Sequence, residues 1–221
     1  DIGPLDTGLV DVWPTDRGSP DTGAAPSCPT GMGYIPGGTF MMGDADIASW
    51  GASPPHMVTV SAFCMDLTEV TVAAFVMCTA SQCTAPFSYP YCNRELTGRN
   101  SHPVNCVSWF RATAFCRWRG GDLPTDAQWE YAARGTDGRT YPWGNDVPPS
   151  LPCALLRSTC PVRSFPSLNS PFGLFDMGGN VWEWTADWYA GYTEAAATNP
   201  TGPSSGTSHA LRGGAGTSGA S

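Results

Sequence analysis

The sequence predicts an irregular α+β fold with little regular secondary structure, about three short helices and short antiparallel strands. Its 221 residues include 26 glycines and 21 prolines, and only 14% of them are charged. Long amphipathic helices need more charged residues and fewer helix breakers than this composition offers. The 41% hydrophobic content, with nine tryptophans, is enough to fill one core. A single loop-rich domain anchored by aromatic side chains is therefore the simplest expectation.

The first strands are expected early in the domain. Residues 33–43 place β-forming side chains on both sides of the Pro36-Gly37-Gly38 triplet. Such a pattern predicts a β-hairpin that turns at this triplet. A further strand is expected over residues 56–66, where apolar and β-branched residues are frequent.

Two short helices are predicted in the middle of the chain. Thr71 is suited to cap a helix that ends near Cys78 and carries Val72, Phe75 and Val76 on one side. Ser108 is suited to cap a second helix, and apolar residues then recur at spacings of three and four. That helix should stop at residues 120–121, which are both glycine.

The third helix has the clearest signals. Thr125 and Gln128 have the spacing of a capping box, and Gly135 stands where a helix-ending glycine is common. We therefore predict a helix over residues 126–134. After residue 141 the chain is rich in turn-forming residues, and short strands are predicted at three apolar pieces, namely Pro161-Val162, Phe172–Phe175 and Val181–Trp184.

The nine cysteines indicate an oxidising compartment. They include no C-x-x-C pair, and the three histidines are widely separated, so no zinc or iron pattern is present. Disulfides are the better interpretation of so many cysteines. Because the number is odd, one thiol is left over, and we expect it to be Cys28.

Charge and composition also exclude several kinds of partner. The net charge is -8 and no Lys/Arg cluster occurs, which excludes nucleic acid and an anionic membrane surface as expected partners. No apolar run approaches the roughly 20 residues that would span a bilayer. Residues 1–31 mix Asp, Thr, Gly and Pro, which predicts a disordered, lipoprotein-like acidic linker before a domain at 32–221. With no signal-peptide segment at Asp1, we expect a mature or trimmed chain.

A series of motifs follows in a distinctive order over about four-fifths of the chain. This series resembles the formylglycine-generating enzyme, or sulfatase-modifying factor, family. The resemblance implies a C-type lectin-like fold with bound calcium. The motifs are Ile35–Gly43, Glu69–Thr71, His102–Val104, Val107–Trp109, Leu123–Gly135, Tyr141–Asn145, Gly173–Trp184 and Leu211–Gly214.

The resemblance places a calcium site in the segment 176–183. Its ligands would be the Asp176 and Glu183 side chains and the Gly179 and Val181 carbonyls, and oxygen donors of this kind suit Ca²⁺. On the residues alone, Asp176 could instead cap a turn and Glu183 could pair with an arginine. The family's other calcium site would lie between residues 143–145 and 161–162. There we expect a Cys153–Cys160 disulfide to replace the ion.

The catalytic residues of the family are not matched. The resemblance implies a copper-binding Cys pair just after a Gly-Gly that corresponds to Gly213-Gly214. Ser218 stands at the expected position of the first cysteine, and the second would lie beyond Ser221. A serine hydroxyl is a poor ligand for Cu(I). We therefore expect no catalytic residue, and a domain that lacks the family's final C-terminal segment.

Two functions follow as expectations. The first is a non-catalytic, calcium-stabilised extracytoplasmic domain, whether secreted, periplasmic or surface-tethered, whose loops bind a protein or a glycan. The second is a copper- and oxygen-dependent oxidoreductase that converts a sulfatase cysteine to formylglycine in a fuller natural chain. Several tryptophans could stack on sugars, although packing in the core is their more common role. No residue pattern selects one ligand or one oligomeric state.

Overall fold

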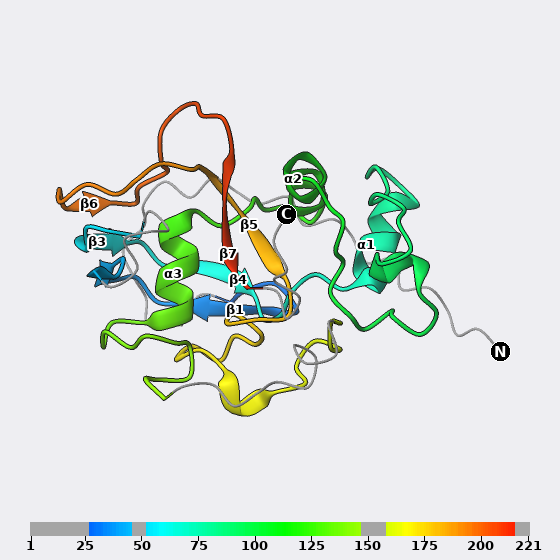
Figure 1. Cartoon of the computed structure of the whole chain (residues 1–221), viewed down its shortest axis with the longest axis horizontal. Helices are drawn as coiled ribbons and strands as arrows, with labels where there is room; N and C mark the ends of the chain where they lie inside the picture. The colour runs from blue at the N-terminus through cyan, green and yellow to red at the C-terminus, as the bar shows by residue number, and fades with distance from the viewer. Residues whose placement is uncertain (1–26, 46–51, 147–157, 215–221) are drawn as a thin grey trace.

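A computed structural model describes residues 27–45, 52–146 and 158–214, and within them it shows the expected irregular α+β architecture (Figure 1). Three α-helices, two short 3-10 helices and seven short strands alternate along these residues. The helices are α1 (Val72–Thr79), α2 (Trp109–Trp118), α3 (Asp126–Arg134), η2 (Asn93–Glu95) and η3 (Pro166–Leu168). The strands are β1 (Met32–Ile35), β2 (Gly38–Met42), β3 (His56–Val60), β4 (Phe63–Asp66), β5 (Trp182–Trp188), β6 (Ala197–Thr198) and β7 (His209–Gly213).

The predicted hairpin at Pro36-Gly37-Gly38 is wrong. Its two arms, β1 and β2, are strands, but β1 pairs with β4 and β2 pairs with β3, both antiparallel. The two ladders share one register, since the pair Ile35↔Phe63 is followed three residues later by Gly38↔Val60. Residues 36 and 37 are therefore an interruption in one long ribbon.

The interruption has a local cause. Pro36 has no N–H to give to a ladder. At Gly37, a Cβ would lie 2.9 Å from the Val60 carbonyl oxygen and 2.9 Å from the Ala62 backbone nitrogen. The backbone at Gly37 therefore passes very close to the backbone of residues 60–62. The strand predicted over 56–66 is confirmed, with the same break at residues 61–62. The short β6 adds to β3 in parallel, through Val58↔Ala197 and Thr59↔Thr198.

All three predicted helices are confirmed, and two of them have the predicted cap. The Thr71 hydroxyl accepts a hydrogen bond from the Ala74 N–H at 3.2 Å. Thr125 and Gln128 form the complete capping box at the start of α3. Ser108 occupies the N-cap position of α2, but its side chain makes no capping bond.

The faces and ends of the helices agree with the sequence in most places. In α1, Val72 and Phe75 are buried as predicted, whereas Val76 is 43% exposed. The first helix ends at Thr79, one residue beyond the expected Cys78, and α2 ends before a glycine, Gly120, that has a positive φ of 84°.

Two of the three late strand predictions are wrong. Val181–Trp184 corresponds to β5, which pairs antiparallel with β7. Residues 161–162 and 172–175 lie in turns and irregular loop instead of strands. The positive φ of Arg163, 65°, bends the chain after the first piece. A turn bond from the Gly173 N–H to the Ser170 carbonyl closes the second.

Two buried clusters form the core. The larger cluster joins β1, β2 and β3 to α3 and to the segment before β5. Figure 1 shows α3 lying across these strands, with α1 and α2 on the opposite side of β5. The smaller cluster lies between α1 and α2, where Phe75 and Phe115 stack with their centroids 5.2 Å apart.

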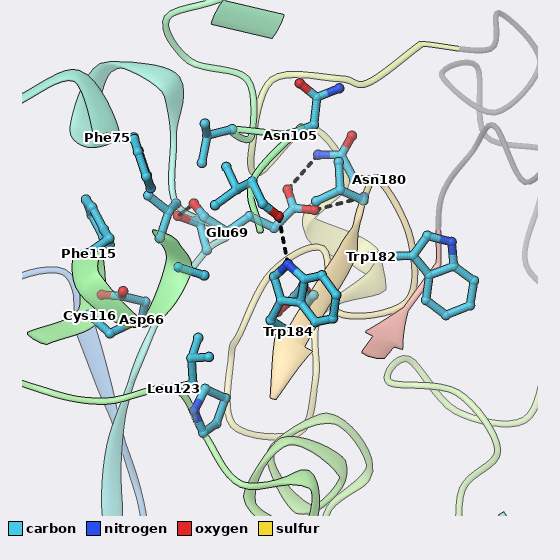
Figure 2. Close-up of a pocket in the computed structure, with 18 of the residues that line it drawn as sticks. Asp66, Glu69, Phe75, Asn105, Phe115, Cys116, Leu123, Asn180, Trp182 and Trp184 are labelled. Atoms are coloured by element: carbon cyan, nitrogen blue, oxygen red, sulfur yellow. Dashed lines mark hydrogen bonds between the residues drawn. The ribbon is translucent and has the colours of Figure 1, made fainter. Parts of the chain in front are cut away.

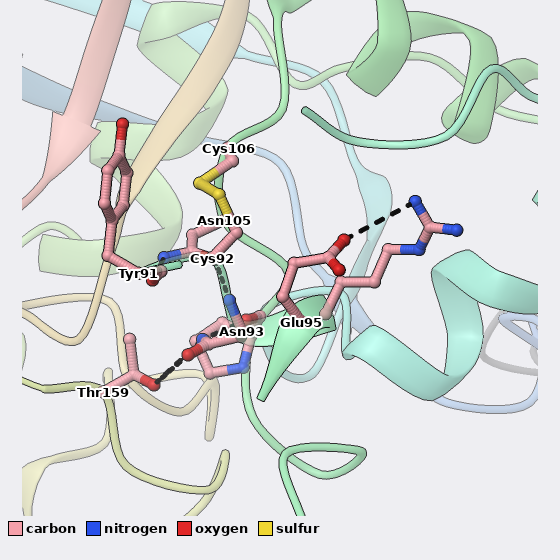
Figure 3. The surroundings of a disulfide bond; sticks show 9 residues. Tyr91, Cys92, Asn93, Glu95, Asn105, Cys106 and Thr159 are labelled. Carbon is pink, nitrogen blue, oxygen red and sulfur yellow. Dashed lines mark hydrogen bonds and ion pairs between the residues drawn. A yellow bond between two sulfur atoms is a disulfide. The ribbon is translucent and has the colours of Figure 1, made fainter. Parts of the chain in front are cut away.

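Three disulfides occur among the described residues: Cys28–Cys64, Cys78–Cys83 and Cys92–Cys106, the last of which is shown in Figure 3. The expectation that Cys28 is unpaired is wrong, because the β1–β4 pairing brings Cys64 within 5.7 Å of it, measured between Cα atoms. Cys116 is the free cysteine of the described residues.

Other predictions fall partly outside this part of the chain. Cys160 is disulfide-bonded, but Cys153 lies outside the described residues, so the Cys153–Cys160 pairing stays a prediction. Residues 1–26 of the predicted linker also lie outside them. Within the described ranges, no helix has the length and apolar character needed to cross a membrane.

Candidate functional site

The candidate site is the loop of residues 176–183, which leads into β5. Two of its non-glycine residues, Asp176 and Asn180, have positive φ angles of 62° and 69°. The Val181 N–H donates to the Gly179 carbonyl at 2.9 Å, which closes a three-residue turn around Asn180. A turn of this kind with a positive φ is rare and strained. Such strain is found where the surroundings hold a functional segment in place.

The two carboxylates predicted as ligands are each held by one donor. The Asp176 Oδ2 accepts from the Arg163 backbone N–H at 2.7 Å. The Glu183 Oε2 accepts from the Trp129 indole N–H at 3.1 Å. Asp176 therefore does cap a turn, whereas the partner of Glu183 is an indole and not an arginine.

The space beside Gly213 is surrounded by oxygen atoms. This glycine has a φ of 83°, and a Cβ built on it would lie 3.2 Å from the Val181 carbonyl oxygen and 3.8 Å from the Glu183 Oε1. The Met177 carbonyl oxygen is 3.7 Å from the same point. In the β5–β7 ladder, Gly213 lies opposite Trp182. Two of the four predicted calcium ligands thus converge on one small space that has no side chain in it.

Carbonyl oxygens are an essential part of this donor set. No group of three Asp, Glu, His or Cys side chains in the described ranges is arranged to hold a metal ion by itself. Ca²⁺ accepts backbone carbonyls together with carboxylates. The three oxygens beside Gly213, one from a carboxylate and two from backbone carbonyls, are a mixed set of this kind.

Glu69 belongs to the same cluster, although no role was predicted for it. It lies between β4 and α1 and is 8% exposed. Its Oε2 accepts from the Asn180 side-chain amide at 2.7 Å, and its Oε1 accepts from the Val181 N–H at 3.1 Å. Its presence in one of the quoted motifs, Glu69–Thr71, was the only signal in the sequence.

Burial raises the pKa of all three carboxyl groups, and neighbouring negative charges add to the shift at Glu69 and Glu183. Burial raises the pKa of Glu183 to about 7, and the charge of Asp176 adds to this. Burial raises the pKa of Glu69 well above its ordinary value, and the charges of Glu183 and Asp176 raise it further. Burial also raises the pKa of Asp176. A buried cluster of like charges is unfavourable until a cation or protons neutralise it.

A cavity of about 1010 Å³ borders this loop. Figure 2 shows Glu69 in the middle of the view, with Asn180 and Trp182 on one side and Phe75 and Phe115 on the other. The exposed rings of the segment 87–91 also line the cavity, namely Phe87, Tyr89 and Tyr91.

The tryptophans differ in what they offer to a ligand. Trp182 lines the cavity and is 45% exposed. The indole of Trp184 donates to the Val107 carbonyl at 2.8 Å, and that of Trp109 donates to the Thr185 carbonyl at 2.8 Å. These two indoles serve packing, and Trp182 is the better platform for a ligand.

The described residues do not fit the copper site of the family. That site takes two thiolates, and the free thiol in this part of the chain is Cys116. Burial raises the pKa of Cys116 to about 12, and the charges of Asp66 and Asp122 contribute. A protonated thiol is a poor metal ligand. Ser218, at the expected cysteine position, lies outside the described residues.

Comparison with known proteins supports the family that the motifs suggest. The model of the family described as "Sulfatase-modifying factor enzyme 1-like domain" matches residues 19–221. The formylglycine-generating enzyme of Streptomyces coelicolor is 34% identical over 263 residues, which cover 91% of this chain and 83% of the relative. The mouse protein named inactive Cα-formylglycine-generating enzyme 2 is 33% identical over 213 residues, covering 72% and 69% of the two chains.

A solved structure has the same fold. PvdO from Pseudomonas aeruginosa superimposes with a TM-score of 0.68 at 24% identity, over 84% of this chain and 82% of that one. The order of the motifs and the irregular α+β fold agree with these matches. This chain belongs to the sulfatase-modifying factor enzyme 1-like domain family.

Proposed function

We propose that this domain is a calcium-stabilised, non-catalytic binding module that acts outside the cytoplasm. The observation that carries the proposal is the set of oxygens around Gly213, together with buried carboxylates that repel one another. The Asp176 and Glu183 side chains and the Gly179 and Val181 carbonyls would hold the ion. Bound calcium supplies the positive charge that offsets this repulsion.

Calcium binding has a direct test. Melting temperature is measured by differential scanning fluorimetry in EDTA and in calcium chloride. We expect calcium to raise it, because an ion that binds only the folded state stabilises that state by about 2.7 kcal/mol at a hundredfold excess over Kd. Asp176→Ala should abolish the difference. Asp137→Ala, which removes an exposed carboxylate beside Arg139, should leave it unchanged. A parent protein with no calcium dependence would refute the site.

The cavity and its aromatic rim support a binding role. Trp182, Tyr89 and Tyr91 are all more than 40% exposed, and the tyrosine rings stack with their centroids 5.4 Å apart. Exposed aromatic side chains are common anchors for protein and glycan ligands.

The binding role is tested by comparing the parent with Trp182→Ala and Tyr91→Ala on a glycan array and on a displayed peptide library. We expect a ligand whose binding falls at least tenfold in either variant. Ligands that bind both variants as well as the parent would place the binding surface elsewhere. Absence of any ligand on both platforms would count against the module.

Two further findings support the proposal. Three disulfides in the described residues indicate an oxidising compartment, which agrees with a secreted, periplasmic or surface-tethered location. One relative with 33% identity is a protein named as an inactive member of the family. Loss of catalysis with retention of the fold therefore has a precedent among the relatives.

The second candidate is an oxidoreductase that converts a sulfatase cysteine to formylglycine with copper and oxygen. It is favoured by the relatives named formylglycine-generating enzyme, at 32–34% identity. The test is incubation with a Cys-x-Pro-x-Arg peptide, copper and oxygen, followed by mass spectrometry. We expect no aldehyde from this chain. Aldehyde formation, or a Cys pair encoded after Ser221, would favour the oxidoreductase.

A further inference from the structure

We propose that Glu69 is a positioning residue of the cation site, which holds the strained turn at Asn180 so that the oxygens beside Gly213 converge. This inference rests on the proposed calcium site. It adds a residue from a distant part of the chain, 107 positions before Asp176 in the sequence. Glu69 is not one of the four ligands, and it would act through the loop that bears them.

The contact between Glu69 and the loop has two points. One carboxylate oxygen accepts from the Asn180 side chain and the other accepts from the Val181 backbone N–H (Figure 2). The same Val181 N–H closes the turn onto Gly179. One carboxylate therefore fixes both the side chain at the centre of the turn and the N–H that closes it.

Asn180 passes this support to the other end of the loop. Its side-chain oxygen accepts from the Cys160 N–H at 2.9 Å, and its amide nitrogen lies 3.2 Å from the Cys160 carbonyl oxygen. Three residues after Cys160, the Arg163 N–H donates to Asp176. Glu69, Asn180 and the segment 160–163 thus brace the loop at both ends.

The connection between β4 and α1, which carries Glu69, is itself held in place by hydrogen bonds. The next residue, Val70, accepts a backbone bond from the Val104 N–H at 2.8 Å, and Thr71 caps α1. Asn180 has a left-handed backbone, which non-glycine residues keep only where the surroundings determine it. A buried carboxylate on a fixed connection meets this requirement.

The charge of Glu69 should also act on the ion. Glu69 accepts from the backbone N–H of Val181, whose carbonyl is one of the proposed ligands, so its carboxylate would lie close to the ion. A divalent cation beside Gly213 would be attracted by all three carboxylates, including the one that does not bind it. A glutamine cannot replace Glu69, because its side-chain nitrogen would face one of the two N–H donors.

The experiment measures metal affinity and stability separately. Terbium luminescence, excited through the neighbouring indoles, is titrated and then displaced with calcium for the parent, Glu69→Gln, Glu69→Asp and Asn180→Gly. Glycine adopts the positive φ without strain, so Asn180→Gly removes the side-chain link and keeps the turn accessible. Glu95→Gln is the control, since it makes the same change at a half-exposed pair with Arg94.

We expect Glu69→Gln to weaken metal affinity 10- to 100-fold, the range found for residues that orient metal ligands. Glu69→Asp, which keeps the charge but is too short to reach both donors, and Asn180→Gly should each weaken it less. In EDTA the melting temperature of Glu69→Gln should fall less than that loss of affinity implies, because removal of a like charge partly offsets the lost hydrogen bond. Glu95→Gln should bind metal as the parent does.

The outcomes separate the two proposals. A parent that binds neither terbium nor calcium would overturn the calcium site and this inference together. A parent that binds, with all three loop variants binding equally well, would overturn only the role of Glu69. An equal loss of melting temperature with and without calcium, at unchanged affinity, would show that Glu69 only packs. If Glu69→Gln fails to fold, Glu69→Asp and Asn180→Gly decide the question.

Discussion

Phe115 shows what a single side chain contributes to the smaller core cluster. It is 1% exposed and stacks on Phe75, which joins α2 to α1. Phe115→Ala should lower the free energy of unfolding by about 3–5 kcal/mol, because it removes buried apolar area and leaves a cavity. Urea unfolding followed by circular dichroism measures the change. Phe110→Ala on the same helix, where the ring is 74% exposed, should change stability by less than about 0.5 kcal/mol.

Cys116 should be an unreactive thiol in the folded protein. With a pKa raised to about 12, roughly one thiol in ten thousand is ionised at pH 8. We expect iodoacetamide to label the Cys116 peptide slowly under native conditions and quickly in denaturant, as measured by mass spectrometry. Rapid labelling of the native protein would show that the thiol is exposed.

The same shift has a consequence for stability at high pH. The folded pKa of Cys116 lies above the ordinary value of about 8.5, so the unfolded state ionises first as the pH rises. The folded state keeps its full stability below the pKa of the unfolded thiol, and it loses stability as the pH rises from that value toward 12. Cys116→Ser should therefore show a smaller loss of melting temperature between pH 8 and pH 10.5 than the parent does. An equal loss in both proteins would contradict this.

Individual residues can be related to one another from the sequence where they lie close together along the chain. Asp176 and Glu183 lie in one short motif, and the structure places Glu183 beside Gly213, while the role of both residues as calcium ligands stays a prediction. Glu69 could not be found in this way, because its contact with Asn180 spans 111 positions and has no local spacing. The error at Cys28 has the same cause, since its partner is set by strand pairing.

At the scale of secondary structure, the capping box of α3 gives a sharp test. Thr125 accepts from the Gln128 N–H at 3.1 Å, and the Gln128 side chain accepts from the Thr125 N–H at 2.9 Å. Thr125→Ala should cost about 1 kcal/mol of stability. Ser108→Ala is the matched control, because Ser108 sits at the N-cap of α2 without a capping bond. Equal effects in the two variants would show that the box contributes little.

The helices were easier to predict than the strand pairing. Helix caps and stops are local signals, and α3 begins and ends as the residues around Thr125 and Gly135 indicate. Pro36-Gly37-Gly38 carries an equally strong local signal for a turn. It is overridden because residues 56–66 pair with both of its flanks. Pairing between distant segments depends on the packing of the whole core, which no short window contains.

At the scale of the whole molecule, Arg212 ties the last described strand to α3. Its Nη2 donates to the Asp126 Oδ2 at 2.6 Å, its Nη1 is 3.0 Å from the Glu130 Oε2, and it also contacts the Tyr192 hydroxyl. Arg212→Ala would leave two buried carboxylates without this partner, and should cost about 3–5 kcal/mol. Chemical unfolding measures the loss. Arg117→Ala, at an exposed pair with Asp122, should cost less than about 1 kcal/mol.

The overall architecture was predictable mainly through the ordered series of motifs. Composition indicated sparse secondary structure, and the motifs indicated the family that the comparisons show. Neither indicated that β1 and β2 would form one ribbon with β3 and β4, or that β6 would join β3 in parallel. Short strands in such loop-rich folds are defined by their partners, and these partners lie up to 139 positions apart.

The Cys28–Cys64 bridge determines how this domain would respond to mechanical load. A pull on the segment before residue 27 enters the fold at Cys28 and passes through a covalent bond to Cys64 in β4, opposite Tyr34 of β1. Peeling β1 away from its N-terminal end would therefore stop at this bond. Single-molecule extension should therefore reach a lower unfolding force after reduction, because the load would then act directly on the β1–β4 pairing.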